Sequence, residues 1–510
     1  MNRTFGQDDT ICAIATPLGY GSIGVIRVSG SEAVSIVSQL FRGNLKKFES
    51  HTVHCGAIID PSTNQSIDYA LMLVMKGPRS YTGEDVIEIQ SHGNPALLQR
   101  ILSAIISCGA RLAGPGEFTR RAFLAGKMDL AQAEAVMEVI SAQDHSAQAM
   151  ALNQLRGKLS EKIDAVREEI LLLLSQIEAS IDFTEQGIDL CSPEEIAARI
   201  DKQHQSVRDL LAQYEEGKQI REGISIVIIG RPNVGKSSIM NHLLGEDRAI
   251  VTPIPGTTRD TLEEGLNLQG HLVKIIDTAG VRDTTDPIEK EGVSRGEAAV
   301  KRADIALFIL DASEPIQKED MDLWDKIAGK KKVVVLNKID LPLKIDLEAI
   351  HAKFPTDTIV SLSAITGEGF SDLKDQLVAL IVPRGHGPCE GESEPPLVAL
   401  LRHKNALERA EHAMKRALQL AMEQMEASRG EGFFPHRVER GAGFARPSEG
   451  RPSPAGCGGI ESEALRPPHR VDEFIAADLR EALSALGEIV GETTTDEILD
   501  QIFNQFCIGK

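Results

Sequence analysis

The chain has 510 residues, of which 42% are hydrophobic and 25% charged, and its formal net charge is −20. This length exceeds what one hydrophobic core supports, so we expect roughly two to four domains, and the acidic balance excludes a general nucleic-acid binder because phosphate binding depends on Lys and Arg. The seven cysteines include no C-x-x-C pair, which argues against a disulfide framework or a zinc site. The sequence also lacks a leader and an apolar run of about 18 residues, which predicts a cytoplasmic protein without a membrane anchor.

Residues 1 to about 125 predict a small α/β or α+β domain. Strand-like runs alternate there with a helical pattern that follows Asn94. The runs lie at 23–29, 69–75 and 85–90.

A helical region follows, from about Asp129 to Glu222. Its apolar residues recur at spacings of three and four, which predicts two or more long helices. Ser192, Pro193 and Glu195 are typical of a helix start, as the N-cap, the first helical residue and the closing residue of a capping box.

From 224 to about 383 the pattern changes to short β-branched runs that alternate with helical spans. Such alternation indicates βαβ units around a largely parallel sheet. The runs lie at 224–230, 273–280, 303–311, 331–340 and 358–363.

Helical patterns return after a hinge rich in Pro, Gly and acids. We therefore expect an α/β domain that is inserted into a helical domain built from both sides of it. The expected boundaries are 1–125, 126–222, 223–383 and 384–510. Residues 429–468 contain 8 Gly and 6 Pro in 40 positions and indicate a disordered insert, although its arginines could also contact RNA.

The sequence GRPNVGKS, Gly230 to Ser237, matches the phosphate-binding pattern G-x-x-x-x-G-K-[ST]. It stands between a predicted strand and a predicted helix, which is the context that this motif requires. Backbone N–H groups of the turn offer an anion cradle, Lys236 brings a charge to the outer phosphates and Ser237 can ligate Mg²⁺.

Further nucleotide motifs follow in order. In DTAG, Asp277 can hold Mg²⁺ through water, and the Gly280 amide can meet the γ-phosphate. In NKID, the Asp340 carboxylate can accept the two adjacent N–H donors of guanine, and Ser363 and Ala364 lie in a loop that could contact the base. Together these motifs predict a GTPase, and the competing interpretation is a purely structural α/β domain.

The residue that orients the attacking water is not evident from spacing. Many small GTPases place Gln just after D-x-x-G, but Val281 stands at that position and cannot hydrogen-bond to water. Four nearby acids are alternatives: Asp283, Asp286, Glu289 and Glu291.

In several longer stretches of sequence the chain resembles the MnmE (TrmE) family of bacterial tRNA modification GTPases. The likeness rests on ATPLGYGSIGVIRVSG, TGEDVIEIQSHG, GPGEFTRRAFLAGKMDLAQAEAV, GRPNVGKSS, VTPIPGTTRD and the terminal FCIGK. It implies a three-domain homodimer that dimerises through an N-terminal folate-binding domain and carries a Ras-like G domain in its helical domain. It also implies a complex with the FAD-containing protein MnmG. Together they would add an aminomethyl or carboxymethylaminomethyl group at C5 of the wobble uridine (U34) of certain tRNAs.

The resemblance also implies ligands for the G domain. K⁺ would be bound by Asn233, Thr252, Ile254 and Thr257, and Mg²⁺ by Ser237 and Thr258. K⁺ would act in place of an arginine finger, and Glu289 would orient the water. Without the resemblance, Asn233 could order its own turn and Glu289 could be a solvated carboxylate. The GTP-binding residues would be Asn233, Val234, Gly235, Lys236, Ser237, Ser238, Thr252, Pro253, Ile254, Pro255, Gly256, Thr257, Thr258, Asp277, Thr278, Ala279, Gly280, Asn337, Lys338, Ile339, Asp340, Ser363, Ala364 and Ile365.

For the one-carbon donor, a 5-formyl or 5,10-methylene tetrahydrofolate, the resemblance implies the ligands Arg27, Glu88, Lys127 and Lys510. Each alone would be an ordinary surface charge. The terminal Cys507 does not suit prenylation, because Gly509 and Lys510 replace the residues that such an anchor needs. We expect its thiol to act in the modification step. The remaining alternatives are a switch GTPase without covalent chemistry and a dimeric scaffold with vestigial activity.

Overall fold

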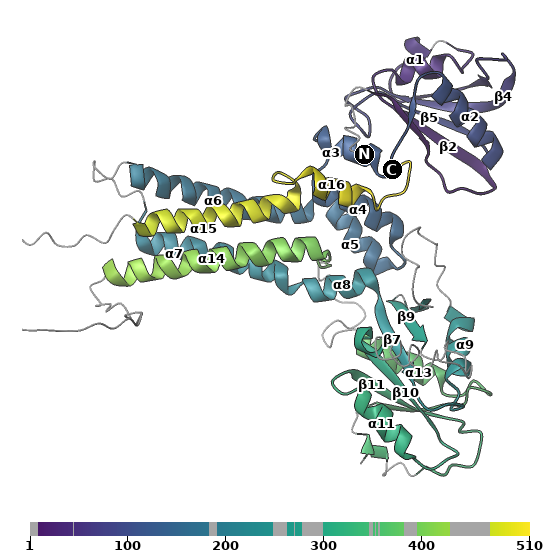
Figure 1. The fold of residues 1–510 in the computed structure, drawn as a ribbon, viewed down its shortest axis with the longest axis vertical. Coiled ribbons are helices and arrows are strands. Elements are labelled where there is room, and N and C mark those ends of the chain that lie inside the picture. The colour runs from purple at the N-terminus through teal and green to yellow at the C-terminus, as the bar shows by residue number, and fades with distance from the viewer. Residues whose placement is uncertain are drawn as a thin grey trace, which may run out of the picture. The chain divides into compact units, whose positions relative to one another are not determined.

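The computed structural model forms two compact units, and each is described by itself (Figure 1). The first comprises Met1–Ser160, Gln213–Leu400 and Val490–Lys510, and the second comprises Glu161–Ala212 and Leu401–Ile489. The structure describes residues 9–43, 45–182, 191–247, 263–269, 271–277, 299–345, 350–351, 353–354, 358–381, 395–428 and 470–510. The predicted insert 429–468 lies outside them.

The N-terminal part of the first unit is built on a six-stranded sheet of order β3-β4-β5-β2-β1-β6. Its neighbouring strands are antiparallel, except that β1 and β6 are parallel. The strands are β1 (Ile11–Ile14), β2 (Gly21–Ser29), β3 (Thr52–Ile59), β4 (Ser66–Met75), β5 (Val86–Gly93) and β6 (Arg111–Leu112). The three predicted strand runs are thus confirmed.

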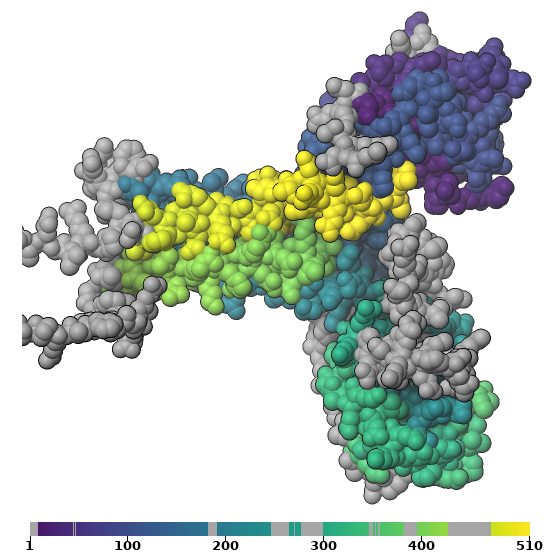
Figure 2. All heavy atoms as spheres, viewed as in Figure 1, coloured from purple at the N-terminus to yellow at the C-terminus, as the bar shows by residue number. Residues whose placement is uncertain are grey.

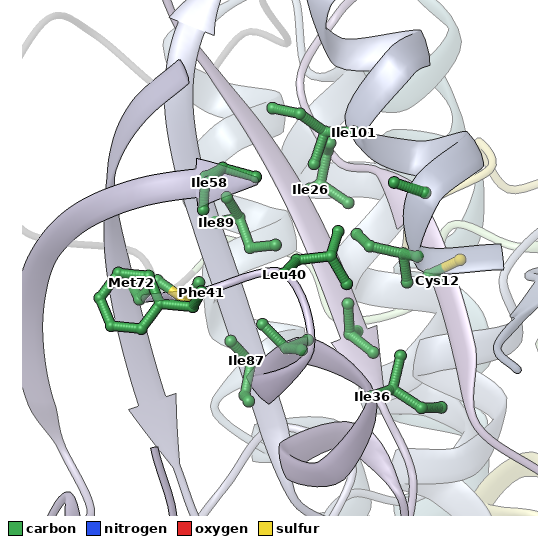
Figure 3. Packing of buried hydrophobic residues seen from close by; sticks show 14 of the residues in the cluster. Cys12, Ile26, Ile36, Leu40, Phe41, Ile58, Met72, Ile87, Ile89 and Ile101 are labelled. Atoms are coloured by element: carbon green, nitrogen blue, oxygen red, sulfur yellow. The ribbon is translucent and has the colours of Figure 1, made fainter. Parts of the chain in front are cut away.

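Helices α1 (Ala33–Ser38) and α2 (Pro95–Ser107) contribute to the core of this sheet. Figure 3 shows Ile101 of α2 beside Ile26 of β2, and Ile36 of α1 belongs to the same cluster as Ile87 and Ile89 of β5. The predicted helix start is confirmed, because the Asn94 side chain accepts hydrogen bonds from the N–H groups that open α2.

The second sheet has the order β12-β11-β10-β7-β9-β8. Its strands are β7 (Ile224–Ile229), β8 (Glu263–Leu268), β9 (His271–Asp277), β10 (Ile305–Asp311), β11 (Lys331–Asn337) and β12 (Ile359–Ser361). All neighbours are parallel except the hairpin of β8 with β9. Hydrophobic clusters cover both faces, which explains why β10 is buried at every residue. Helices α9 (Lys236–Asp247), α11 (Lys318–Lys326) and α13 (Phe370–Ile381) accompany the sheet.

The sequence did not predict β8. Its residues EEGLNL include Glu, Gly and Asn, which are depleted in strands. The strand forms because its full length pairs with β9 and because Leu266 and Leu268 are buried. Tertiary pairing therefore overrides the local preference.

Long helices make up the second unit: α6 (Lys158–Asp182), α7 (Pro193–Ala212), α14 (Leu401–Ser428) and α15 (Arg470–Val490). The predicted capping box of α7 is confirmed by hydrogen bonds between Ser192 and Glu195 in both directions, 3.2 and 3.3 Å long. Figure 2 shows the atoms of α15, in yellow, along those of α14, in green. Ion pairs of Arg416 with Asp478 and Glu481 join these two helices at 2.7 and 2.6 Å.

The chain ends against the N-terminal part of the first unit. Helices α3 (Glu117–Leu124), α4 (Leu130–Ser141) and α16 (Asp496–Phe503) share an apolar cluster in which Phe503 and Phe506 are buried. Helices α5 (His145–Leu155) and α8 (Tyr214–Glu222) also belong to this unit. None of the helices in the described ranges has the length and hydropathy that a bilayer crossing requires.

Candidate functional sites

The predicted phosphate-binding loop joins β7 to α9, so its predicted strand and helix are confirmed. Two of its residues have left-handed backbone angles, Asn233 with φ 64° and Gly235 with φ 100°. A Cβ atom on Gly235 would lie 2.1 Å from the Asn337 Nδ2 atom. Only glycine therefore fits this position, for reasons of both backbone angle and space.

The Lys236 ammonium closes this loop in the described structure. Its Nζ atom donates to the carbonyl oxygens of Gly230 and Arg231 at 2.9 and 2.8 Å. Because an ammonium on a flexible stem can change partners, these two bonds can be exchanged for phosphate oxygens. Ser237 and Ser238 are exposed at the start of α9.

Asn337 connects the loop to the other side of the site. Its Nδ2 atom donates to the Val234 carbonyl at 2.7 Å, and its Oδ1 atom accepts from the Ala364 amide at 3.0 Å. The residue is 1% exposed. Asn337 therefore links the phosphate-binding loop, the end of β11 and the loop of Ala364 through one buried side chain.

The residues predicted to bind the base lie on this second loop and, in the case of Asp340, just after β11. The Ser363 hydroxyl donates to Asp340 Oδ1 at 2.6 Å and accepts from the amides of Ile365 and Thr366 at 3.3 and 3.2 Å. Asp340 is exposed, and Ile365 is 83% exposed. An exposed carboxylate that is oriented by one hydroxyl suits the paired N–H donors of guanine.

Sequence reasoning missed Asp311, at the end of β10. Its carboxylate pairs with Lys338 Nζ at 2.5 Å and accepts from the Ser313 amide and hydroxyl at 2.9 and 2.6 Å. Burial alone would raise the pKa of Asp311, but the hydrogen bonds from Lys338 and Ser313 outweigh it and hold the pKa below its ordinary value. The pair fixes Lys338, whose φ is 69°.

Sequence reasoning also missed the partners of Arg231. The Arg231 guanidinium donates to Asp320 at 2.8 Å and to Glu314 at 3.2 Å, and Arg231 and Asp320 are 9% and 1% exposed. Asp320 also accepts from the Gln317 amide at the start of α11. This pair attaches the first turn of the phosphate-binding loop to α11, and no spacing rule in the sequence identifies it.

The remaining nucleotide residues lie largely outside the described part of the chain. The backbone of Asp277 is described and ends β9, which pairs in parallel with β7. Parallel strands end at one edge, so Asp277 lies at the edge that carries the phosphate-binding loop. The predicted residues outside the described ranges are Thr252, Pro253, Ile254, Pro255, Gly256, Thr257, Thr258, Thr278, Ala279, Gly280 and Glu289, together with the acids Asp283, Asp286 and Glu291.

A second group of predicted residues, which we call the tail site, is formed by Arg27, Glu88, Cys507 and Lys510. Arg27 on β2 pairs with Glu88 on β5 at 2.8 Å, and its Nη1 atom donates to the Gly509 carbonyl at 3.5 Å. The Phe118 amide donates to the Lys510 carbonyl at 3.2 Å. The structure thus brings the last residues of the chain to the charges of the N-terminal sheet.

The Lys510 side chain is half-buried in this group. Burial, and then the charge of Arg27, lower the pKa of its amine, whereas Glu88 and Cys507 act in the opposite direction. Cys507 is exposed. A cation, an ion pair and an accessible thiol therefore occupy one site, which suits a ligand with carboxylates and N–H donors.

Lys127 is placed differently from the other predicted folate ligands. Its Nζ atom donates to the Pro78 carbonyl, and its stem lies beside Gly83. Tyr81 lies between Pro78 and Gly83 in the sequence, and the centre of its ring is 5.3 Å from the Arg27 guanidinium. Lys127 thus contacts the loop that borders the tail site, and within the described residues it makes no direct bond to Arg27, Glu88 or Lys510.

Two family models match the chain. The first, GTP-binding protein TrmE N-terminus, covers residues 10–127, and the second, MnmE helical domain, covers residues 130–430 and 462–507. Among solved structures, a variant of Era from Aquifex aeolicus bound to GDP and aluminium fluoride is 30% identical with a TM-score of 0.26, and the match covers 38% of this chain and 66% of that one. At that TM-score the match carries no argument about the fold.

Two curated relatives are similar along almost their whole length. The protein from Carboxydothermus hydrogenoformans is 42% identical over 509 residues, which cover 99% of this chain and 100% of the relative. The protein from Geobacter sulfurreducens is 40% identical over 504 residues, which cover 99% of each chain. Both are named tRNA modification GTPase MnmE. With these full-length relatives and both family models in agreement, the chain belongs to the MnmE family of tRNA modification GTPases.

Proposed function

We propose that this protein is a K⁺-dependent GTPase that modifies C5 of the wobble uridine (U34) of tRNA together with an FAD-containing MnmG-type partner. The product would carry an aminomethyl or carboxymethylaminomethyl group, and a tetrahydrofolate derivative would supply the carbon. The proposal rests on membership of the family along the whole chain and on two sites with different chemistry in one unit.

In the nucleotide site, Lys236 and the loop amides bind the phosphates, and Asp340 selects guanine. The left-handed turn at Asn233 and Gly235 supports this role, because it aims consecutive amides at one point. Mg²⁺ would be held by Ser237 and Thr258, and K⁺ by Asn233, Thr252, Ile254 and Thr257. Of these ligands only Ser237 and Asn233 lie in the described structure, where both are exposed. Glu289 would orient the attacking water.

In the tail site, Arg27 and Lys510 bind the carboxylates of the folate, and Glu88 accepts from its N–H donors. Lys127, on the loop that borders the site, would contact the same carboxylates. The observation that carries this part is the contact of Arg27 with the Gly509 carbonyl, because it places the terminal Lys510 and Cys507 beside the ion pair of Arg27 and Glu88. The exposed Cys507 thiol serves the modification step and takes no part in hydrolysis.

We also propose that the chain acts as a homodimer joined through its N-terminal domain, 1–125. Exposed apolar side chains at the start of β2 and just before it support this, with Leu18, Tyr20 and Ile23 at 78%, 89% and 63% exposure. The G domain, 223–383, is inserted between the helical stretches 126–222 and 384–510. The order of the elements supports this arrangement, because the helices α6 and α7 precede the second sheet in the chain and α14 and α15 follow it.

Nucleoside analysis tests the proposal. In a strain that lacks the gene, position 34 of the substrate tRNAs should lose its C5 modification, and the wild-type gene should restore it. Normal nucleosides in the deletion strain would contradict the proposal and favour a switch GTPase without covalent chemistry.

A variant separates the two sites within the same assay. Cys507→Ser should fail to restore modification while its GTP hydrolysis stays near the wild-type rate. Cys55→Ser is the matched control, because Cys55 is also exposed and lies in β3. If Cys507→Ser restored modification fully, the role of the thiol would have to be abandoned.

A further inference from the structure

A basic cavity lies at the edge of the second sheet where its parallel strands begin. Its volume is about 360 Å³, and its charged lining residues are Lys301, Arg302, Asp304, Lys330 and Lys331. The phosphate-binding loop and NKID follow the opposite ends of β7 and β11. The cavity is therefore separate from the nucleotide site.

Strand pairing explains why these cations meet. Ile305 at the start of β10 pairs in parallel with Lys331 at the start of β11. The segment 301–304 is thereby held beside the segment 329–331. Lys332 does not line the cavity, and its ammonium lies 4.2 Å from the centre of the Trp324 ring.

The four cations lack carboxylate partners among the residues that the structure describes. Lys330 donates to the carbonyls of Lys301 and Ala303 at 2.8 and 2.6 Å, and Lys331 donates to the Leu380 carbonyl at 3.1 Å. Lys301 and Arg302 are exposed. Within the described ranges, the positive charge of the cavity is therefore not neutralised by ion pairs.

The carboxylate in the described lining belongs to Asp304, and it bonds to Ser225. Asp304 accepts from the Ser225 amide and hydroxyl at 2.9 and 2.6 Å, which fixes the start of β7. A structural explanation of these cations would be attraction to the carboxyl end of a helix, which stabilises a nearby cation by about 0.3–1 kcal/mol. That effect would explain one lysine at a helix end, but it does not explain four cations around one cavity.

We propose that this cavity binds phosphate groups of the tRNA backbone, an inference that rests on tRNA being the substrate. A chain with a net charge of −20 needs a local basic surface to approach RNA. Among the described residues that line the cavity none is aromatic, so they offer no stacking platform for a base. The contact therefore positions the tRNA without reading its sequence.

The test uses the full-length chain and a fluorescently labelled tRNA transcript, with binding measured by anisotropy over a series of KCl concentrations. In the variant Lys301→Gln/Arg302→Gln, affinity should fall about tenfold at low salt. The slope of log affinity against log salt should become shallower by about 1.4 to 1.8, because each lost phosphate contact removes about 0.7 to 0.9. GTP hydrolysis should not change.

A matched control makes the same change of charge elsewhere in the same domain. In Lys318→Gln/Lys353→Gln both side chains are exposed and lie outside the cavity lining, and the salt slope should stay within about 0.3 of wild type. Equal affinities and slopes for the two double variants would overturn the proposal.

Two further outcomes distinguish other ligands. If pyrophosphate binds wild type but not Lys301→Gln/Arg302→Gln while tRNA binding is equal in both, the cavity is a site for free anions and the proposal fails. If that variant binds tRNA normally but loses the flavoprotein partner, the cavity is a protein interface and the proposal also fails. Failure of the wild-type chain to bind tRNA, with normal nucleosides in the deletion strain, would instead overturn the proposed function itself.

Discussion

In the nucleotide site, the described contacts join segments that follow strands β7, β11 and β12 of one sheet, whereas in the tail site Arg27 of β2 contacts a carbonyl 482 residues later in the chain. The first site is built from turns that connect elements of one domain. In the second, the tail approaches β2 after α16, which packs on α3 and α4. The two sites are therefore built independently, and a change in one should leave the chemistry of the other intact.

The strongest test of this independence is Lys236→Ala. Removal of the charge that we propose contacts the outer phosphates should lower the rate of GTP hydrolysis by about 10²- to 10³-fold. Folate binding, measured by titration calorimetry, should be unchanged because the tail site lies on the other sheet. Lys318→Ala, an exposed lysine of the same domain, is the control. A loss of folate affinity in Lys236→Ala would show that the sites are coupled.

Potassium dependence tests the nucleotide site alone. With Na⁺ in place of K⁺ at fixed ionic strength, hydrolysis should slow roughly tenfold or more. The reason is that the positive charge that bound K⁺ would supply beside the β/γ-phosphate bridge is then lost or misplaced. Asn233→Ala should be slow in both salts. Equal wild-type rates in K⁺ and Na⁺ would remove Asn233 from the proposed potassium ligands.

The difference between the sites also explains what could be predicted from the sequence. The turn at Gly230 to Ser237 and the residue types of NKID have fixed spacing, because each binds its ligand within one loop. The tail site has no such spacing, so Arg27, Glu88 and Lys510 were identified only through the resemblance to a family.

Other contacts could be predicted neither from motif spacing nor from the resemblance to a family. The pairs of Arg231 with Asp320 and of Asp311 with Lys338 join residues that are 89 and 27 positions apart. In the sequence Asp311 and Asp320 are ordinary charges, and the motifs that contain Arg231 and Lys338 do not indicate these partners. Strand β8 was missed for a related reason, since its pairing with β9 and not its composition makes it a strand.

Asn337→Ala should have a smaller effect, because it removes connections between loops and no direct charge on the ligand. The Val234 carbonyl and the Ala364 amide would lose their partner, and the free energy of unfolding should fall by about 1–3 kcal/mol. We expect GDP affinity to fall roughly tenfold. Chemical denaturation and nucleotide titration would measure both quantities. Ser361→Ala, exposed at the end of β12, should change neither, and an unchanged GDP affinity in Asn337→Ala would show that the base loop is held in some other way.

The smallest expected effect lies in the tail site and depends on pH. Burial and the charge of Arg27 place the pKa of Lys510 below its ordinary value of 10.5. The protonated amine binds ligand carboxylates, so folate affinity should fall as the pH rises toward that lowered pKa, and it should be regained on return to neutral pH.

Two substitutions identify Lys510 as the origin of this dependence. Lys510→Ala should weaken folate binding at neutral pH by about fivefold, which is about 1 kcal/mol for one partly exposed charged contact. Lys510→Arg keeps its charge at every accessible pH and should therefore retain affinity while losing the alkaline decline. If Lys510→Arg declined with pH as wild type does, Lys510 would not be the origin of the pH dependence. GTP hydrolysis should be the same in all of these variants, because the tail reaches its site without any contribution from the nucleotide loops.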